Sequence, residues 1–77
     1  MSTVQTDELE PFGAMLMRRR NALGLTRPEL AARLHLARTT IFRWETGVST
    51  PTRIMASHAR KMLARLEADA RSQRAVA

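Results

Sequence analysis

The segment from Ala37 to Gly47 limits the fold most strongly, because its pattern fits a short helix with one buried face. Ile41 and Trp44 lie three residues apart, so both point to the same side of such a helix. The other side carries only polar and basic side chains: Arg38, Thr39, Thr40 and Arg43. Gly47 supplies the left-handed residue that ends many helices, and 48–51 is typical of an exposed turn. The rest of the chain must therefore cover the apolar side.

The outward side of this predicted helix favours contact with nucleic acid. Arginine forms paired hydrogen bonds with guanine edges and phosphates, and threonine offers both a hydroxyl and a methyl group. The alternative is a solvated helix face, on which Glu and Lys would be as common as Arg and Thr. Arg38 and Arg43 are therefore the first candidates for a contact with DNA. Phe42 falls on neither the core side nor the DNA-contacting side, and the sequence leaves open whether it packs on the last helix, meets a partner chain or touches the DNA sugar-phosphate edge.

The charge of the chain agrees with a polyanionic partner. It has 13 basic and 7 acidic residues, and every basic residue except Lys61 is arginine. Three of the acids lie within the first ten residues, so residues 11–77 hold 13 basic residues against 4 acidic ones, a net charge of +9. Such a domain attracts nucleic acid. The alternative is a GC-rich genome, which enriches Arg and Ala throughout a proteome.

Several function classes lack the residues that they need. The chain has no cysteine, and therefore no disulfide and no thiolate metal site. His35 and His58 have no companions at metal-ligand spacing, and there is no Ser/His/Asp set or glycine-rich phosphate loop. We expect no enzyme, no cofactor and no small-molecule ligand. No apolar run reaches the length of a membrane span and the N-terminus is unlike a signal peptide, so we expect a cytoplasmic protein.

Two helices are predicted before the central segment. The first covers 11–23, starting at Pro11 and stopping at Gly24, with core positions at Phe12, Met15, Leu16 and Leu23. The second starts at Thr26, where Glu29 three residues later completes a capping box, and ends near Leu34 with Leu30, Ala31 and Leu34 inward. Only three residues then precede the central helix. Two short helices so close together predict a helix-turn-helix.

A last helix is predicted over 52–72, because this stretch contains no Gly or Pro. Its first two turns are expected to complete the core through Ile54, Met55 and Ala59. A further apolar stripe would then be exposed on a monomer, and we expect it to form a homodimer: Met62, Leu63 and Leu66. The predicted organisation is a flexible acidic arm over 1–10, a DNA-binding domain with its dimerisation helix over 11–72, and a frayed tail over 73–77.

These apolar, turn and cap positions together carry a resemblance to a known family. The matching residues are Phe12, Gly13, Leu16, Arg20, Leu23, Gly24, Leu25, Thr26, Leu30, Ala31, Leu34, Thr40, Ile41, Trp44, Glu45, Thr46, Gly47 and Pro51. In this run, a little over half of the chain, the sequence resembles the helix-turn-helix domain of the Cro/repressor family, also called the XRE family. The resemblance and the helix pattern together imply an all-α, compact domain of four helices with a long C-terminal helix that binds double-stranded DNA.

The resemblance also implies roles for single residues. Arg20 and Glu45 match a partly buried salt bridge that joins the first helix to the recognition helix. The positions that would contact DNA bases are Arg38, Thr39 and Arg43. The positions that would contact the DNA backbone are Arg19, Arg27, Thr40 and Thr46.

Three positions depart from the family pattern within the motif. His35 occupies the usual Gly position between the two helices, where the backbone is left-handed. Ala37 replaces the usual Ser or Thr cap, and such a loss costs about 1 kcal/mol. Arg27 replaces a Gln, which would shift that position from base and phosphate hydrogen bonding towards charge alone.

The sequence thus predicts a homodimeric repressor or autoregulator, of phage or bacterial type, on an inverted-repeat operator. One alternative with the same fold is an antitoxin or a restriction-modification controller. Another, from a different class, is a helical interaction module, such as a phage inhibitor that binds an acidic host protein. Binding indifferent to DNA sequence would favour this last alternative.

Overall fold

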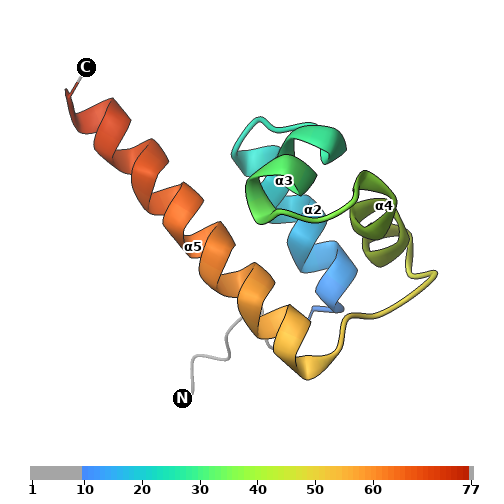
Figure 1. The fold of residues 1–77 in the computed structure, drawn as a ribbon. Helices are drawn as coiled ribbons and strands as arrows, with labels where there is room; N and C mark the ends of the chain where they lie inside the picture. The colour runs from blue at the N-terminus through green and yellow to red at the C-terminus, as the bar shows by residue number, and fades with distance from the viewer. Residues whose placement is uncertain (1–9, 77) are drawn as a thin grey trace, which may run out of the picture.

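The computed structural model describes residues 10–76, which form four helices without a strand. These are α2 (Phe12–Ala22), α3 (Arg27–Leu34), α4 (Arg38–Thr46) and α5 (Arg53–Val76) (Figure 1). The predicted fold class, an all-α domain with a long last helix, is confirmed. The acidic arm predicted over 1–10 lies outside the described residues except for Glu10.

The first two helix boundaries follow from local chemistry. α2 ends where Gly24 adopts a φ of 72°, and the Leu25 amide donates to the Arg20 carbonyl at 3.2 Å. α3 begins with the predicted capping box: the Glu29 amide donates to Thr26 Oγ1 at 3.2 Å, and the Thr26 amide donates to Glu29 Oε1 at 2.8 Å. These side chains satisfy helix-end amides that would otherwise need water.

The turn between α3 and α4 tolerates both departures from the family pattern. His35 adopts a left-handed φ of 59°, and the Leu36 amide donates to the Ala31 carbonyl at 2.9 Å. Ala37 occupies the N-cap of α4 and provides no side-chain hydrogen bond. α4 ends at Gly47 with a φ of 79°, as predicted.

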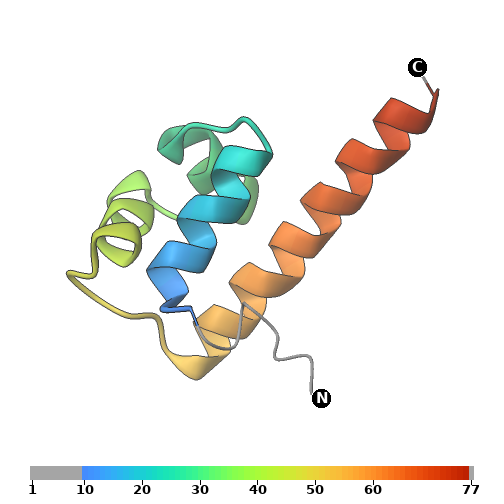
Figure 2. The same cartoon turned by 180° about the vertical axis from the view of Figure 1, so that it is seen from behind.

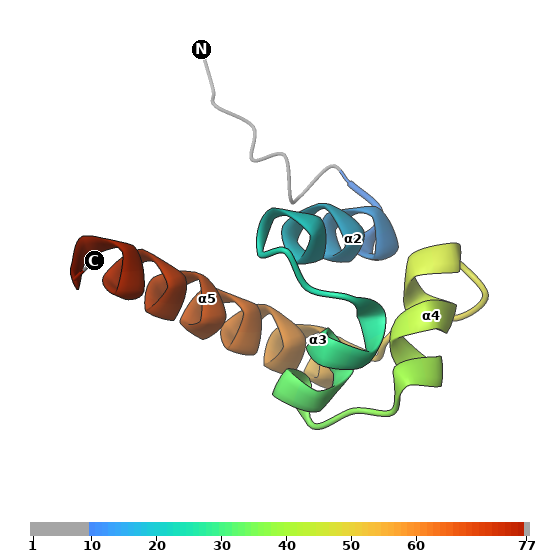
Figure 3. The same cartoon turned by 90° about the horizontal axis from the view of Figure 1, so that it is seen from above.

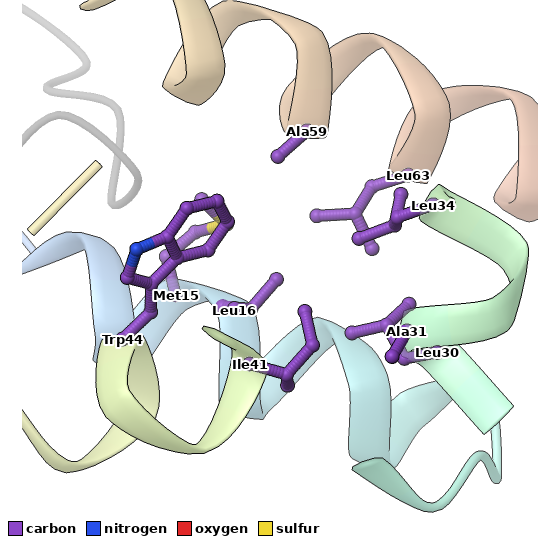
Figure 4. Packing of buried hydrophobic residues seen from close by; sticks show 9 residues of the cluster. All are labelled: Met15, Leu16, Leu30, Ala31, Leu34, Ile41, Trp44, Ala59 and Leu63. Atoms are coloured by element: carbon purple, nitrogen blue, oxygen red, sulfur yellow. The ribbon is translucent and has the colours of Figure 1, made fainter. Parts of the chain in front are cut away.

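The core lies where all four helices meet (Figure 4). Ile41 and Trp44 are buried as predicted, and Trp44 packs edge-on against Phe12 with ring centroids 5.6 Å apart. The fully or almost fully buried apolar residues are Met15, Leu16, Leu30, Ala31, Leu34, Ile41, Trp44, Ala59 and Leu63. The inward side of α4 is therefore fixed by residues from α2, α3 and α5.

Gly13 allows α2 and α4 to approach closely. A Cβ atom at this position would lie only 2.0 Å from the Trp44 carbonyl oxygen and 3.2 Å from the Glu45 Cα. Both of those atoms belong to the backbone, so they cannot move aside as a side chain could. The start of α2 therefore requires glycine for packing, although its φ is not left-handed.

The packing of α5 corrects two predictions. Leu63 is fully buried in the core, so the expectation that it lies exposed beyond the core was wrong, and Met62 and Leu66 are partly buried against the same core. Ile54, predicted to close the core, is instead 80% exposed. Ala59 and Leu63 lie four residues apart on the face that meets the core, whereas Ile54 points away from that face.

The end of α5 extends away from the other helices (Figures 1 and 2). It continues to Val76, beyond the predicted end near residue 72, because no Gly or Pro interrupts it and its Ala and Arg residues favour helix. Helix thus replaces the frayed tail expected over 73–77, except at residue 77, which is not described. Arg19 ties α2 to this helix through Glu67, with Nη2 to Oε1 at 2.6 Å and Nε to Oε2 at 2.8 Å.

Candidate nucleic-acid interface

The outward side of α4 presents the predicted DNA-contacting residues to solvent. Arg38, Thr39 and Arg43 are exposed, and Thr40 is half-buried. Within residues 10–76, the guanidinium groups of Arg38 and Arg43 form no ion pair and no hydrogen bond. Seen from above, α4 lies at the opposite end of the molecule from the C-terminus of α5 (Figure 3). Two guanidinium groups are therefore available for hydrogen bonds with a ligand on the exposed side of α4.

Glu45 anchors the end of α4 from within. Its side chain is fully buried, and Arg20 donates to it from Nε at 2.7 Å and from Nη2 at 2.9 Å. Arg20 also donates from Nη1 to the Leu25 carbonyl at 2.9 Å. The predicted salt bridge between Arg20 and Glu45 is thus confirmed, and it joins α2, the loop before α3 and α4 in one network. Paired hydrogen bonds of this kind fix orientation as well as charge.

A second arginine completes the neutralisation of Glu45. Arg27 donates from Nε to Glu45 Oε1 at 2.8 Å. Burial alone would raise the pKa of Glu45, but the hydrogen bonds and positive charges of Arg20 and Arg27 outweigh burial and hold that pKa below its ordinary value. The hydrogen bond to Glu45 raises the pKa of Arg20. The carboxylate is therefore charged, and it holds α4 to both preceding helices.

Arg27 also contacts the outward side of α4. Its guanidinium carbon lies 5.1 Å from the centroid of the Phe42 ring, within the range of a cation–π interaction, and its side chain is 34% exposed. Its Nη atoms have no partner within the described part of the chain. Arg27 can therefore present these donors to a phosphate while Glu45 holds its Nε.

The other predicted backbone contacts have less support from the geometry. The Thr46 hydroxyl donates to the Phe42 carbonyl at 2.8 Å, so in this conformation its oxygen can only accept further hydrogen bonds. The Arg19 guanidinium is paired with Glu67 of α5, and the Arg19 side chain is 14% exposed. Of the residues predicted to contact DNA, Arg19 is the one whose donors are most fully engaged within the protein.

A family model described as helix-turn-helix matches residues 16–57, which is more than half of the chain. The chain belongs to the XRE-type helix-turn-helix family. This XRE-type protein is therefore a DNA-binding regulator, and α3 and α4 both lie within the matched residues. Searches of curated proteins and of solved structures each found no match. In the part that the structure describes, no helix is both long and apolar enough to span a membrane.

Two features of the XRE-type interface were missed by sequence reasoning. The first is the bond between Arg27 and Glu45, because nothing in the sequence indicates that one carboxylate accepts two arginines. The second is the position of Phe42, which had three open alternatives: packing on the last helix, meeting a partner chain or touching the DNA backbone. The one hint was the Arg at position 27, where the family pattern usually has Gln, but it does not indicate which groups that side chain meets.

Proposed function

We propose that this XRE-type regulator is a homodimeric repressor or autoregulator that binds an inverted repeat. The observation that carries the proposal is the outward side of α4, where Arg38, Thr39 and Arg43 are exposed on a helix that Glu45 fixes to α2 and α3. Arginine forms bidentate contacts with guanine, and a rigid helix holds such contacts in register with the bases. These three residues are the proposed base contacts.

Charge and the flanking residues support affinity for the DNA backbone. Residues 11–77 carry 13 basic and 4 acidic side chains. Arg27 stands beside α4 with free Nη donors, and Thr40 lies in the first turn of α4. Contacts with phosphates fix the register of the protein but carry no sequence information, so binding should weaken steeply as salt rises.

The dimer is proposed from the geometry of recognition and from the end of α5. A single recognition helix covers few base pairs, and regulators with this motif commonly bind two half-sites about one helical turn apart. Leu63 is unavailable for the interface because the core buries it, which leaves Met62 and Leu66 as the proposed apolar contacts. The part of α5 that extends past the other helices would add surface around them.

Repression would then be steric, because a dimer on an operator that overlaps a promoter excludes the polymerase. The test is selection of bound fragments from a pool of random duplexes, followed by sedimentation of the complex. We expect an enriched inverted repeat, with half-sites about 10 base pairs apart, that binds two copies of the chain. Enrichment of no sequence would contradict the proposal, and a single unpaired site bound by one copy would contradict its dimer.

A further inference from the structure

We propose that Phe42 contacts the C5-methyl group of a pyrimidine in the half-site, which makes it a specificity residue. This inference rests on the proposed DNA-binding face of α4, and it extends that face by one side chain. It differs from the three alternatives that the sequence left open for Phe42, because the contact is with a base and not with the last helix, a partner chain or the DNA backbone.

The position of Phe42 on α4 supports the proposal. It lies four residues after Arg38 and three after Thr39, so it is their neighbour one turn further along the helix. Its side chain is 48% exposed, whereas Ile41 and Trp44 on the inward side are buried. Phe42 therefore lies on the same exposed surface as the proposed base contacts and does not pack in the core.

Arg27 holds the ring of Phe42 in place. Glu45 fixes the Nε of Arg27 at 2.8 Å, and the guanidinium carbon lies 5.1 Å from the ring centroid. One side of the ring is thus covered by a charged group that is itself anchored to a buried carboxylate. A ring supported in this way loses little conformational entropy when its exposed part meets a ligand.

The chemistry of DNA indicates which of its groups the exposed ring of Phe42 can contact. Phosphates require hydrogen-bond donors, which Arg27 can provide and a phenyl ring cannot. The major-groove edges of the four bases carry hydrogen-bonding atoms and one apolar group, the C5-methyl of thymine. The methyl group of 5-methylcytosine has the same place and chemistry. A C5-methyl is therefore the group that the exposed part of Phe42 matches.

The experiment removes or adds this one methyl group on the selected duplex. Each thymine of a half-site is replaced in turn by deoxyuridine, and each cytosine by 5-methylcytosine, and dissociation constants are measured for the full-length protein. The scan is repeated with Phe42→Ala and with Phe42→Gln, which keeps a long side chain but not the apolar ring. Ile54→Ala is the matched control, because Ile54 is also an exposed apolar residue but lies on α5. Thermal melting checks that every variant folds.

We expect one position at which the methyl group strengthens binding by about fourfold, the factor that corresponds to burying one methylene-sized group. If thymine is the source, deoxyuridine weakens binding there; if 5-methylcytosine is the source, methylation strengthens it. Both Phe42 variants should be insensitive to that methyl group, and Ile54→Ala should behave as the unmodified protein does.

Two results would overturn the inference while leaving the proposed function intact. One is a methyl effect that persists unchanged in Phe42→Ala and Phe42→Gln. The other is a combination of two observations: the unmodified protein shows no methyl dependence at any position, and both variants lose the same affinity on every duplex. Phe42 would then only hold Arg27 in place and would not contact a base. If the unmodified protein instead binds selected and scrambled duplexes equally, the proposed function itself fails.

Discussion

The three helices α2, α3 and α4 differ from α5 in how they are held. Within the three-helix part, the buried Glu45 carboxylate joins all three elements through Arg20 and Arg27, and Gly13 lets two backbones touch. Among the described residues, α5 joins them through apolar residues such as Leu63, through the ion pair of Arg19 with Glu67, and through contacts of His58 with the Leu34 carbonyl and of Arg60 with the Phe12 ring. Much of its second half extends away from them (Figure 2).

This difference separates two tasks. A helix that contacts bases must be held in a fixed orientation, and directional hydrogen bonds to a buried charge provide that orientation. A helix that closes a core, as α5 does, needs only buried apolar area. The end of α5 that extends past the core is therefore free to form another contact, such as the proposed dimer interface. We therefore expect changes near Glu45 to alter stability and DNA contacts together, and changes at the end of α5 to leave the fold intact.

The largest effect should come from Glu45→Ala. It leaves Arg20 in a site where its side chain is only 12% exposed, so unfolding free energy should fall by about 3 to 5 kcal/mol. The matched variant is Glu67→Ala, in which the removed carboxylate is 27% exposed and not fully buried, so solvent can reach the unpaired Arg19 and the loss should be smaller, about 1 to 3 kcal/mol. Urea unfolding measures both. Equal losses would remove the distinction between the two parts of the molecule.

Leu63→Ala should cost about 2 to 5 kcal/mol, because it opens a cavity where α5 meets the core. Ile54→Ala, on the same helix but 80% exposed, should change unfolding free energy by less than about 0.5 kcal/mol. Thermal or urea unfolding compares the two variants. A small effect of Leu63→Ala would mean that α5 is not anchored as the structure shows.

Gly13→Ala should cost about 1 to 3 kcal/mol through overpacking, since the added Cβ would meet the Trp44 carbonyl oxygen. Alanine is otherwise the better helix former by about 1 kcal/mol, so a measured loss understates the clash. Ala14→Ser adds one heavy atom at the next, exposed position and serves as the control. If the first variant is as stable as the second, α2 and α4 are further apart than described.

The pH dependence should isolate the charge of Glu45. Its pKa is lowered in the folded protein, so its contribution is complete above the ordinary value of 4.5 and is lost as pH falls through the folded value. Glu45→Gln should therefore be less stable than the unmodified protein at pH 7, and the difference should narrow below about pH 4.5. The pKa of Glu29 is also lowered, through its hydrogen bonds with Thr26, but Glu29 is present in both proteins and cancels. A difference in melting temperature that is constant down to pH 3 would be evidence against a charged pair.

The sequence predicted the three-helix part well because each turn has its own local signal. Gly24, the capping box at Thr26 and Gly47 each fix a helix boundary without reference to distant residues. The periodicity of Ile41 and Trp44 likewise identifies the buried side of α4. The Arg20 and Glu45 pair came from the family resemblance, since no local pattern links residues 25 apart.

The placement of α5 could not be derived in the same way. Ile54, Met62 and Leu63 all belong to one apolar pattern, and which of them meets the core depends on where the helix crosses the other three. The second partner of Glu45 and the support of Phe42 by Arg27 are also tertiary facts. The exposed arginines of α4 were identified from composition and spacing, while their role at DNA bases stays a prediction.

The central claim is that the outward side of α4 recognises a DNA sequence, and the affinity of Arg43→Ala for two duplexes tests it most directly. One duplex is the selected inverted repeat and the other has the same composition in scrambled order. The account predicts that this variant loses about 1 to 3 kcal/mol of binding free energy on the repeat, much less on the scrambled duplex, and keeps its melting temperature. Equal losses on the two duplexes, or no preference for the repeat in the unmodified protein, would contradict it.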